Sequence, residues 1–310
     1  MASTMTAAAY VFPGQGSQRV GMGQDLYDNF TSVRELFEEA DDTLGFPLSR
    51  LCFEGPEEEL SKTVNAQPAI LTVSMACMSA AAEASWLLIP PSFLAGHSLG
   101  EYTALVAAGV LDFGQALLLT RERGKLMQEA GEKVPGGMAA IIGLDSISVE
   151  QVCQETGAYI SNFNSPGQIV ISGSRETLAR AMDLARAMGA RRVLPLRVSG
   201  AFHSLLMQPA VEGMAQAIST LRFNKPVVPI VANSTAQAVT TAEEIRDELL
   251  RQMASCVQWQ KSIEYMIASG VDTFVEIGPG QVLNGLIKRI NPEAQVFNIE
   301  DTGSLKAMGI

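Results

Sequence analysis

Histidine and positive charge are both scarce in this sequence. The chain has 2 histidines in 310 residues, and its 33 acidic residues outnumber its 22 lysines and arginines, which gives a net charge of −11. Proteins that bind nucleic acids present a basic surface, so this balance argues against nucleic acid as a partner. Charged residues make up 18% of the chain and apolar residues 47%, a composition typical of a folded, enzyme-like globule.

Closely spaced cysteines are also missing. The four cysteines lie far apart, and no two of them form a C-x-x-C pair; they are Cys52, Cys77, Cys153 and Cys256. This spacing predicts buried free thiols in a reducing compartment and argues against a zinc site. We therefore expect no metal.

The sequence lacks a long uninterrupted apolar run. The longest charge-free stretch, 63–82, contains Asn65, Gln67 and Pro68, so we expect a loop that enters a buried helix and not a membrane span. No basic residue precedes Arg19 and no long apolar core is present there. We therefore expect no secretory signal and a cytoplasmic protein. The Ser-, Thr- and Ala-rich start fits a cloning remnant, a short leader or a plastid-processed end, and a plant or algal source would place the protein in the plastid stroma.

The most informative stretch that is present runs Gly96-His97-Ser98-Leu99-Gly100. It follows an apolar run, 86–95, that predicts a strand, and it precedes a helical pattern, 101–108. A Gly-x-Ser-x-Gly between strand and helix is the nucleophile-elbow pattern. The sharp turn tolerates no bulk two residues before and after the serine, and glycine occupies both positions. Ser98 is then held at a helix N-terminus, where free backbone amides stabilise an oxyanion.

Strand and helix patterns alternate on both sides of this elbow. This alternation predicts a parallel sheet with helices on both faces. The expected strands are 10–12, 86–95, 227–232 and 274–277; the expected helices are 28–44, 68–84, 113–129, 242–253, 261–269 and one that ends at Arg289.

The segment 136–203 has a different pattern. Strand patterns at 138–144, 159–163, 169–172 and 192–198 are interleaved with helical patterns at 146–155 and 174–188. The order β-α-β-β-α-β is that of the ferredoxin-like unit. We therefore expect a small subdomain, 136–203, inserted into a large one formed by 1–135 and 204–310.

Arg123 lies on the apolar side of its predicted helix, because its neighbours three and four residues away include Leu119, Thr120, Leu126 and Met127. An unpaired buried guanidinium is costly, so it requires an anion. Two explanations stay open: a structural ion pair with a core carboxylate, or a bidentate clamp on a substrate carboxylate.

His203 is the candidate base for Ser98. The chain's other histidine, His97, is adjacent to the serine in the elbow and cannot easily turn onto its neighbour's hydroxyl. Without a serine that needs a base, His203 would be an ordinary surface residue on a loop; with one, it is the remaining imidazole.

Charge is distributed unevenly along the chain. Residues 21–60 hold eleven acidic residues and two arginines, whereas residues 175–197 hold six arginines and two acidic residues. Both segments are compatible with plain solvated surface. The alternative is that the arginine-rich zone meets an anionic partner.

Another loop, Pro13–Gln18, follows the first strand pattern and contains two glycines, which allow backbone to approach a ligand. It lacks the G-x-G-x-x-G spacing of a dinucleotide site, and a plain turn explains it equally well on this evidence.

Together these motifs resemble those of the malonyl-CoA:acyl carrier protein transacylases of fatty acid synthesis and, more loosely, the acyltransferase domains of polyketide synthases. The resemblance covers about residues 10–290 and includes seven motifs in order: 11–18, 96–101, 123–125, 162–168, 200–203, 257–259 and 276–280. It implies an α/β-hydrolase-like large subdomain that carries the ferredoxin-like insert, and a monomer without cofactors.

The resemblance also implies roles for individual residues. Ser98 is expected to accept the malonyl group as an ester, and His203 to act as its base and then as the acid for the departing CoA thiolate. Arg123 is expected to bind the malonyl carboxylate. The main-chain carbonyl of Gln258 is expected to orient His203, in place of the carboxylate of a standard triad.

The remaining site residues follow from the same resemblance. The backbone amides of Gln15 and Leu99 are expected to form the oxyanion hole. Phe202 is expected to select malonyl by crowding an α-methyl branch, although core packing is an alternative for this ring. Asn162 and Asn164 belong to a family motif without an assigned role.

The expected partners are malonyl-CoA and acyl carrier protein, with the arginine-rich zone meeting the acidic carrier protein or the phosphates of CoA. A serine hydrolase is the nearest alternative, with Asp112, Asp145 or Asp183 as its acid, but such an enzyme has no use for Arg123. A non-catalytic scaffold on the same fold is the other alternative.

Overall fold

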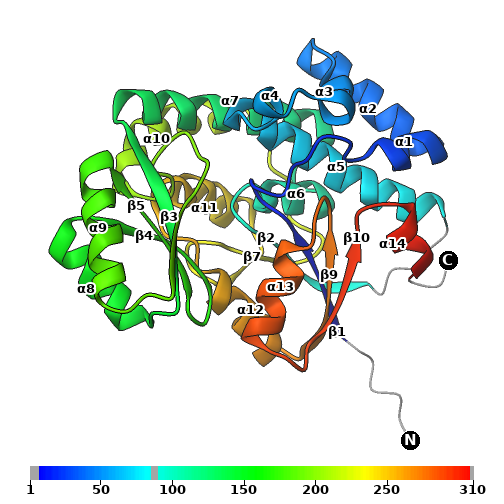
Figure 1. Ribbon diagram of the computed structural model, residues 1–310. Helices are drawn as coiled ribbons and strands as arrows, with labels where there is room; N and C mark the ends of the chain where they lie inside the picture. Colours follow the sequence, from blue (N-terminus) through cyan, green and yellow to red (C-terminus); the bar gives the residue numbers. More distant parts are fainter. Residues whose placement is uncertain (1–6, 85–89, 308–310) are drawn as a thin grey trace, which may run out of the picture.

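The computed structural model describes residues 7–84 and 90–307, which form two β-sheets with surrounding helices (Figure 1). The larger sheet has the strand order β10-β9-β1-β2-β7-β8 and the smaller one β4-β5-β3-β6. Strands of the larger sheet are β1 (Ala7–Phe12), β2 (Pro91–Gly96), β7 (Ile230–Val231), β8 (Ala238–Val239), β9 (Val271–Ile277) and β10 (Gln295–Ile299).

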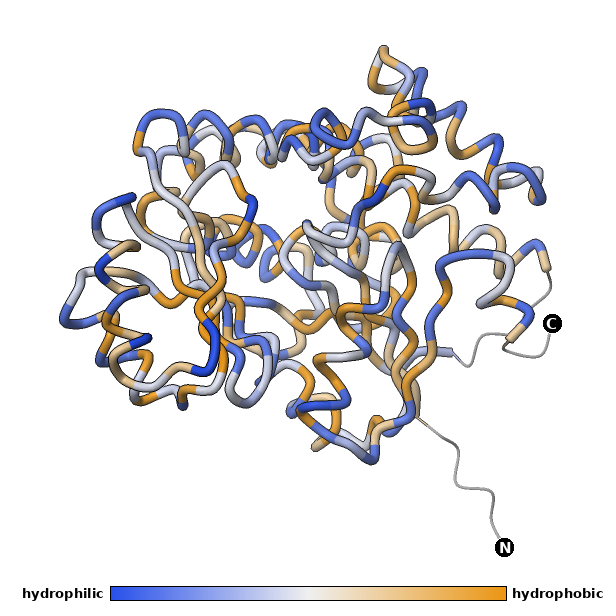
Figure 2. The backbone as a smooth tube through the Cα atoms, in the orientation of Figure 1, coloured by the Kyte–Doolittle hydropathy of each residue, from blue (hydrophilic) through white to orange (hydrophobic). Residues whose placement is uncertain are grey.

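The larger sheet is mainly parallel. β1 lies at its centre and pairs parallel with β2 and β9, whereas β8 pairs antiparallel with β7. Parallel strands buried on both faces are apolar along their whole length, and β1 shows this: Tyr10 and Phe12 pack into one core, Ala9 and Val11 into another. Figure 2 shows these central strands as mostly hydrophobic.

Helices cover both faces of this sheet, as expected. α5 and α6 pack on the face that Phe12 enters, together with α7, and α12 and α13 pack on the opposite face. The helices outside the smaller unit are α1 (Gln24–Asn29), α2 (Thr31–Leu44), α3 (Leu48–Glu54), α4 (Glu57–Leu60), α5 (Thr63–Glu83), α6 (Gly100–Ala107), α7 (Phe113–Lys133), α10 (Gln208–Ser219), α11 (Ala242–Ala254), α12 (Trp259–Ala268), α13 (Val282–Ile290), α14 (Thr302–Ala307) and the short η1 (Leu205–Met207).

The smaller unit has the predicted order of elements and an antiparallel sheet. α8 and α9 cover one face of that sheet, while Met138, Ala140 and Val170 point from its other face toward the larger unit. Its elements are β3 (Gly136–Ile142), α8 (Ser146–Thr156), β4 (Tyr159–Ser165), β5 (Gln168–Ser174), α9 (Arg175–Ala187) and β6 (Arg192–Pro195).

Four expectations about single elements differ from the structure. The strand expected at 192–198 ends at Pro195. The predicted helix 28–44 is two helices, because Phe30 is extended between α1 and α2. The helix expected from Pro68 begins five residues earlier, at Thr63, and contains Pro68 in its second turn. The strand expected at 227–232 is limited to Ile230–Val231. Part of the apolar run 86–95 lies outside the described residues.

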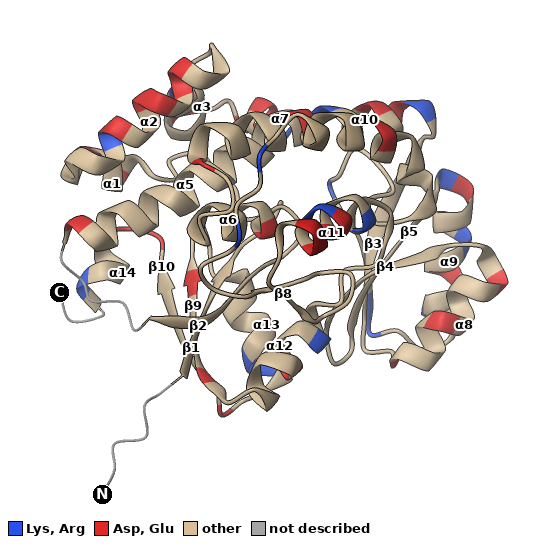
Figure 3. Cartoon of the chain, turned by 180° about the vertical axis from the view of Figure 1, so that it is seen from behind, with Lys and Arg blue, Asp and Glu red and all other residues tan. Residues whose placement is uncertain are grey.

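Charges lie mostly on the helices around the sheets (Figure 3). The acidic segment 21–60 forms α1 to α4, and the arginine-rich segment 175–197 forms α9 and β6 of the smaller unit. None of the helices in residues 7–84 and 90–307 combines the length and apolar character needed to cross a lipid bilayer.

Two glycines let α7 lie directly against neighbouring backbone. A Cβ at Gly124 would lie 2.6 Å from the Thr63 carbonyl oxygen at the start of α5. A Cβ at Gly131 would lie 2.3 Å from the carbonyl oxygen of Ser199, in the loop before His203. The helix that carries Arg123 is therefore held between the start of α5 and the loop before His203.

We expect Gly124→Ala to lower the free energy of unfolding by about 1–3 kcal/mol, because backbone must move to make room for the methyl group. Urea denaturation measures this change. The control is Gly285→Ala in α13, where no heavy atom lies within 4 Å of the added Cβ; there the better helix propensity of alanine should raise stability by up to about 1 kcal/mol. A Gly124→Ala protein as stable as the parent would contradict the close packing.

Candidate active site

Ser98 occupies a strained turn between β2 and α6. Its φ of 53° lies in the left-handed region, which costs energy for a residue with a Cβ. A Cβ at Gly96 would lie 1.9 Å from the carbonyl carbon of Gly100, and a Cβ at Gly100 would lie 2.1 Å from the Phe12 carbonyl oxygen. The turn therefore requires glycine at both flanking positions, as the sequence pattern predicts.

The structure brings Ser98 and His203 into direct contact. The Oγ of Ser98 lies 2.7 Å from Nε2 of His203, although the two residues are 105 positions apart. His203 also has a left-handed φ, 56°. A serine hydroxyl hydrogen-bonded to an imidazole is the arrangement that activates a serine nucleophile.

The carbonyl that meets the other side of the imidazole belongs to Gln252, and the expectation for Gln258 is wrong. Nδ1 of His203 lies 2.9 Å from the main-chain oxygen of Gln252. Gln252 is in the last turn of α11, where carbonyls have no donor within the helix and are free to accept from elsewhere. Gln258 instead precedes α12, and its carbonyl accepts hydrogen bonds from the backbone and hydroxyl of Ser262.

The Gln252 carbonyl determines which nitrogen of His203 carries the proton. A carbonyl only accepts, so Nδ1 is the donor and Nε2 is free to accept from Ser98. Burial, followed by the nearby charge of Arg123, lowers the pKa of His203 to about 3. The imidazole is therefore neutral at neutral pH, which a general base requires.

Arg123 lies beside the same serine. It is 1% exposed; one terminal nitrogen donates to the Gln67 side-chain oxygen at 2.9 Å, and the other donates to Ser98 Oγ at 3.1 Å and to the Gln252 side-chain oxygen at 2.8 Å. Within the described residues no carboxylate forms an ion pair with it. The alternative of a structural ion pair therefore has no support.

The loop after β1 reaches the same place. The backbone amides of Gln15 and Leu99 have no hydrogen-bond acceptor within residues 7–84 and 90–307, and the side chain of Gln15 donates to the Thr63 hydroxyl at 3.2 Å. Both residues line the cleft that contains Ser98.

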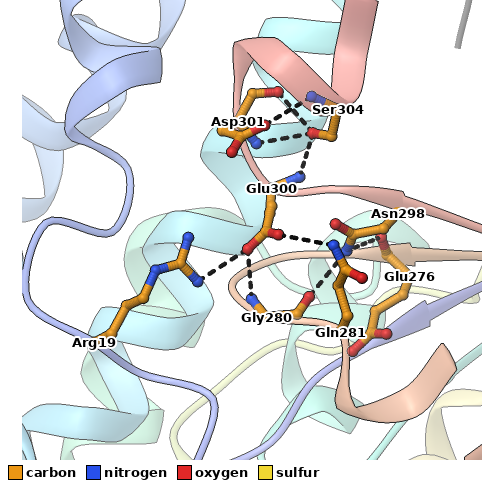
Figure 4. Close-up of polar contacts among 8 residues, drawn as sticks. All are labelled: Arg19, Glu276, Gly280, Gln281, Asn298, Glu300, Asp301 and Ser304. Atoms are coloured by element: carbon orange, nitrogen blue, oxygen red, sulfur yellow. Dashed lines mark hydrogen bonds and ion pairs between the residues drawn. The ribbon is translucent and has the colours of Figure 1, made fainter. Parts of the chain in front are cut away.

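Glu300, the residue after β10, holds the C-terminal end of the loop that follows β1 (Figure 4). The carboxylate accepts from Arg19 at 2.9 Å, from the Gly280 amide at 3.0 Å and from the Gln281 side chain at 3.1 Å. Pro13 contacts the same turn, because a Cβ at Gly278 would lie 2.8 Å from its ring.

The cleft has a volume of about 260 Å³ and lies between the two units. The larger unit contributes the loop 13–17, the elbow, Arg123 and the start of α13. The smaller sheet contributes its uncovered face, including Asn162, Asn164 and Val170, and Phe202 lines the wall next to His203. The described residues include no group of three or more His, Cys, Asp or Glu side chains that could hold a metal ion.

Comparisons with known proteins show the family to which this chain belongs. Residues 9–302 match the model of the acyl transferase domain. The chain belongs to the acyl transferase family. The malonyl CoA-acyl carrier protein transacylase of Escherichia coli (strain K12) is 49% identical over 290 residues, which are 92% of this chain and 93% of that protein. The acyltransferase is similar to it along nearly its whole length.

Two solved structures show the same fold. The acyl carrier protein S-malonyltransferase of Vibrio cholerae superimposes with a TM-score of 0.93 and 43% identity, covering 98% of this acyltransferase and all of that chain. A malonyl-transacylase in complex with a type II PKS acyl-carrier protein gives a TM-score of 0.94 and 45% identity, covering 97% and 98% of the two chains.

Sequence reasoning missed three polar residues of this acyltransferase site. Gln67 and the side chain of Gln252 contact Arg123. Asn233 holds the elbow from both sides, since its side chain accepts from the Ser98 amide at 2.7 Å and donates to the Gly96 carbonyl at 2.7 Å. A polar residue within or directly after an apolar segment is the signal that could have found Gln67 and Asn233.

His97 faces away from the serine, as the sequence suggested. Its Nε2 lies 2.8 Å from the side-chain oxygen of Asn164, and its ring packs edge-on against Trp259, with 5.5 Å between ring centroids. This contact joins the elbow of the larger unit to β4 of the smaller one. Asn162, by contrast, forms a bridge with Val257 through its backbone.

The depressed pKa of His203 predicts how stability depends on pH. The folded state holds the imidazole neutral, whereas the unfolded chain protonates it below about pH 6.5. Wild-type protein should therefore lose about 2 kcal/mol more unfolding free energy between pH 7 and pH 5 than His203→Gln does. Urea titrations at both pH values measure the difference. Equal losses in the two proteins would show that His203 is not buried in its neutral form.

Proposed function

We propose that this acyltransferase moves a malonyl group from coenzyme A to the phosphopantetheine thiol of acyl carrier protein in fatty acid biosynthesis, through an ester on Ser98. The observation that carries the proposal is the convergence of Ser98, His203 and Arg123 on one cleft. A nucleophile, a neutral base and an unpaired cation together suit an acyl group that itself bears a carboxylate. The malonyl CoA-acyl carrier protein transacylases to which the chain is similar support the same substrate.

In the proposed first half-reaction, Ser98 Oγ attacks the thioester carbonyl while His203 Nε2 takes its proton. The oxyanion of the tetrahedral intermediate is stabilised by the amides of Gln15 and Leu99, each worth about 3–4 kcal/mol if it matches oxyanion holes elsewhere. Collapse breaks the carbon–sulfur bond, and His203 returns the proton to the CoA thiolate. The second half-reaction runs the same steps in reverse with the carrier thiol.

Arg123 supplies selectivity in this proposal. Its hydrogen bond to Ser98 Oγ points a guanidinium donor at the reacting group, so a malonyl carboxylate would take over that donor and release the hydroxyl. An acetyl group would leave the buried cation without an anion, and sites of this kind can reject the wrong substrate by about 10⁴-fold. We also propose that the ring of Phe202, which lines the cleft, crowds an α-methyl branch.

We further propose that the larger unit, 1–135 and 204–310, is α/β-hydrolase-like and that 136–203 is a ferredoxin-like insert. The strand order β4-β5-β3-β6 with antiparallel neighbours supports the second assignment. In line with the family resemblance we also propose a monomer, and no cofactor, because the proposed steps use only side chains and backbone amides of this protein.

Intact-mass measurement after incubation with malonyl-CoA tests the proposed chemistry. Wild-type protein should gain one malonyl group, and Ser98→Ala none, because the ester oxygen is removed. Arg123→Ala should lose its preference for malonyl-CoA over acetyl-CoA. A wild-type protein that gains no adduct would refute the serine ester, and release of malonate to water in place of a thiol would favour a hydrolase.

The arginine-rich zone, 175–197, is proposed to receive the acidic carrier protein. Arg191 and Arg192 are exposed at the start of β6, the edge strand of the smaller sheet. The charge-reversing substitutions Arg191→Glu and Arg192→Glu should together raise the KM for carrier protein about tenfold. They should also reduce the dependence of this KM on salt concentration. The kcat should stay near the wild-type value. An unchanged KM would leave this zone as plain solvated surface.

A further inference from the structure

The buried carboxyl group of Glu101 has no role in the mechanism above. Glu101 lies in the first turn of α6, three residues after Ser98, and is 2% exposed. One of its oxygens accepts from the Gln252 side-chain nitrogen at 2.7 Å and from the Asn233 amide at 3.3 Å. No lysine or arginine forms an ion pair with it within the described ranges.

Gln252 contacts all three residues of the proposed mechanism at once. Its main-chain oxygen meets His203, its side-chain nitrogen donates to the Ser98 carbonyl at 3.0 Å, and its side-chain oxygen accepts from Arg123 at 2.8 Å. The two ends of a carboxamide have similar shape and opposite hydrogen-bonding character. If the group turned over, its NH₂ would face the guanidinium and its oxygen would face the Ser98 carbonyl.

We propose that Glu101 is a positioning residue that fixes the orientation of the Gln252 carboxamide, so that its oxygen faces Arg123 and its nitrogen faces Ser98. The oxygen of Glu101 offers an acceptor at the place where the correctly oriented NH₂ arrives. The relay from Glu101 through Gln252 to Arg123 thereby sets where the guanidinium lies relative to the serine. This inference rests on the proposed function, in which Arg123 binds the malonyl carboxylate.

Glu101 acts here as an acceptor and not as a counter-ion. Burial, and secondly the nearby carboxyl group of Glu248, hold the pKa of Glu101 well above its usual range. The carboxyl group of Glu248 is itself engaged elsewhere, since it accepts from the backbone amide and hydroxyl of Ser234. A glutamine at position 101 keeps an acceptor oxygen in the same place, whereas a methionine fills the volume without one.

The test compares loading of Ser98 by malonyl-CoA and by acetyl-CoA, followed by intact mass. We expect Glu101→Met to lower the malonyl-to-acetyl rate ratio by about tenfold or more, because the Gln252 NH₂ loses its acceptor and the carboxamide no longer holds Arg123 in place. Glu101→Gln should keep the ratio within about twofold, since the acceptor remains. Glu248→Gln is the matched control for altering a neighbouring buried carboxyl, and its ratio should equal that of the wild type.

The rate ratios of these variants either support or overturn the relay from Glu101 through Gln252 to Arg123. A wild-type ratio in Glu101→Met, or a loss in Glu101→Gln as large as in Glu101→Met, overturns the relay. If Glu101→Met does not fold, judged by circular dichroism, Glu101→Asp replaces it: its shorter side chain withdraws the acceptor, so an unchanged ratio there also overturns the relay. Wild-type protein that takes up no malonyl group would instead refute the proposed function.

Discussion

A buried guanidinium without a carboxylate partner is the constraint on which this structure depends. Arg123 is almost fully enclosed, yet its acceptors are two carboxamide oxygens and one hydroxyl. An uncompensated charge in such a place costs several kcal/mol, so the rest of the protein must supply that energy. The cation is then poised for an anionic ligand, and it lowers the pKa of His203 from nearby.

Backbone packing offsets part of this cost and places the reacting groups. Ser98 and His203 both adopt left-handed backbone conformations, which persist only where the surroundings hold them. Asn233 holds the elbow from both sides, and the end of α11 supplies the carbonyl for the imidazole. Helix α7 lies directly on backbone at Gly124 and Gly131. Close main-chain contacts and the Asn233 side chain together place the turn and the helix that carry Ser98 and Arg123.

The division into two units gives the cleft its shape. The smaller sheet has one face covered by its own helices and leaves the other to close the site. Hydrogen bonds between Val257 and β4 tie this sheet to the segment before α12, and the contact between His97 and Asn164 ties it to the elbow. The cleft therefore lies between the two units, with Ser98 and Arg123 on the larger one and His203 at the end of the smaller one, where the chain returns to the larger unit.

The sequence by itself determined the local features of this protein. Strand and helix patterns, the glycines that flank Ser98, and the apolar setting of Arg123 each follow from neighbouring residues, whose sterics and periodicity act over a few positions. Only the tertiary structure decided which carbonyl meets His203: Gln258 fits the family motif, but the carbonyl of Gln252 is the one left without a donor at a helix end. The hydrogen bonds of Gln67, Asn233 and Glu101 could not be predicted from the sequence either, because they join segments far apart in the chain. Such bonds depend on distances that no local sequence pattern encodes.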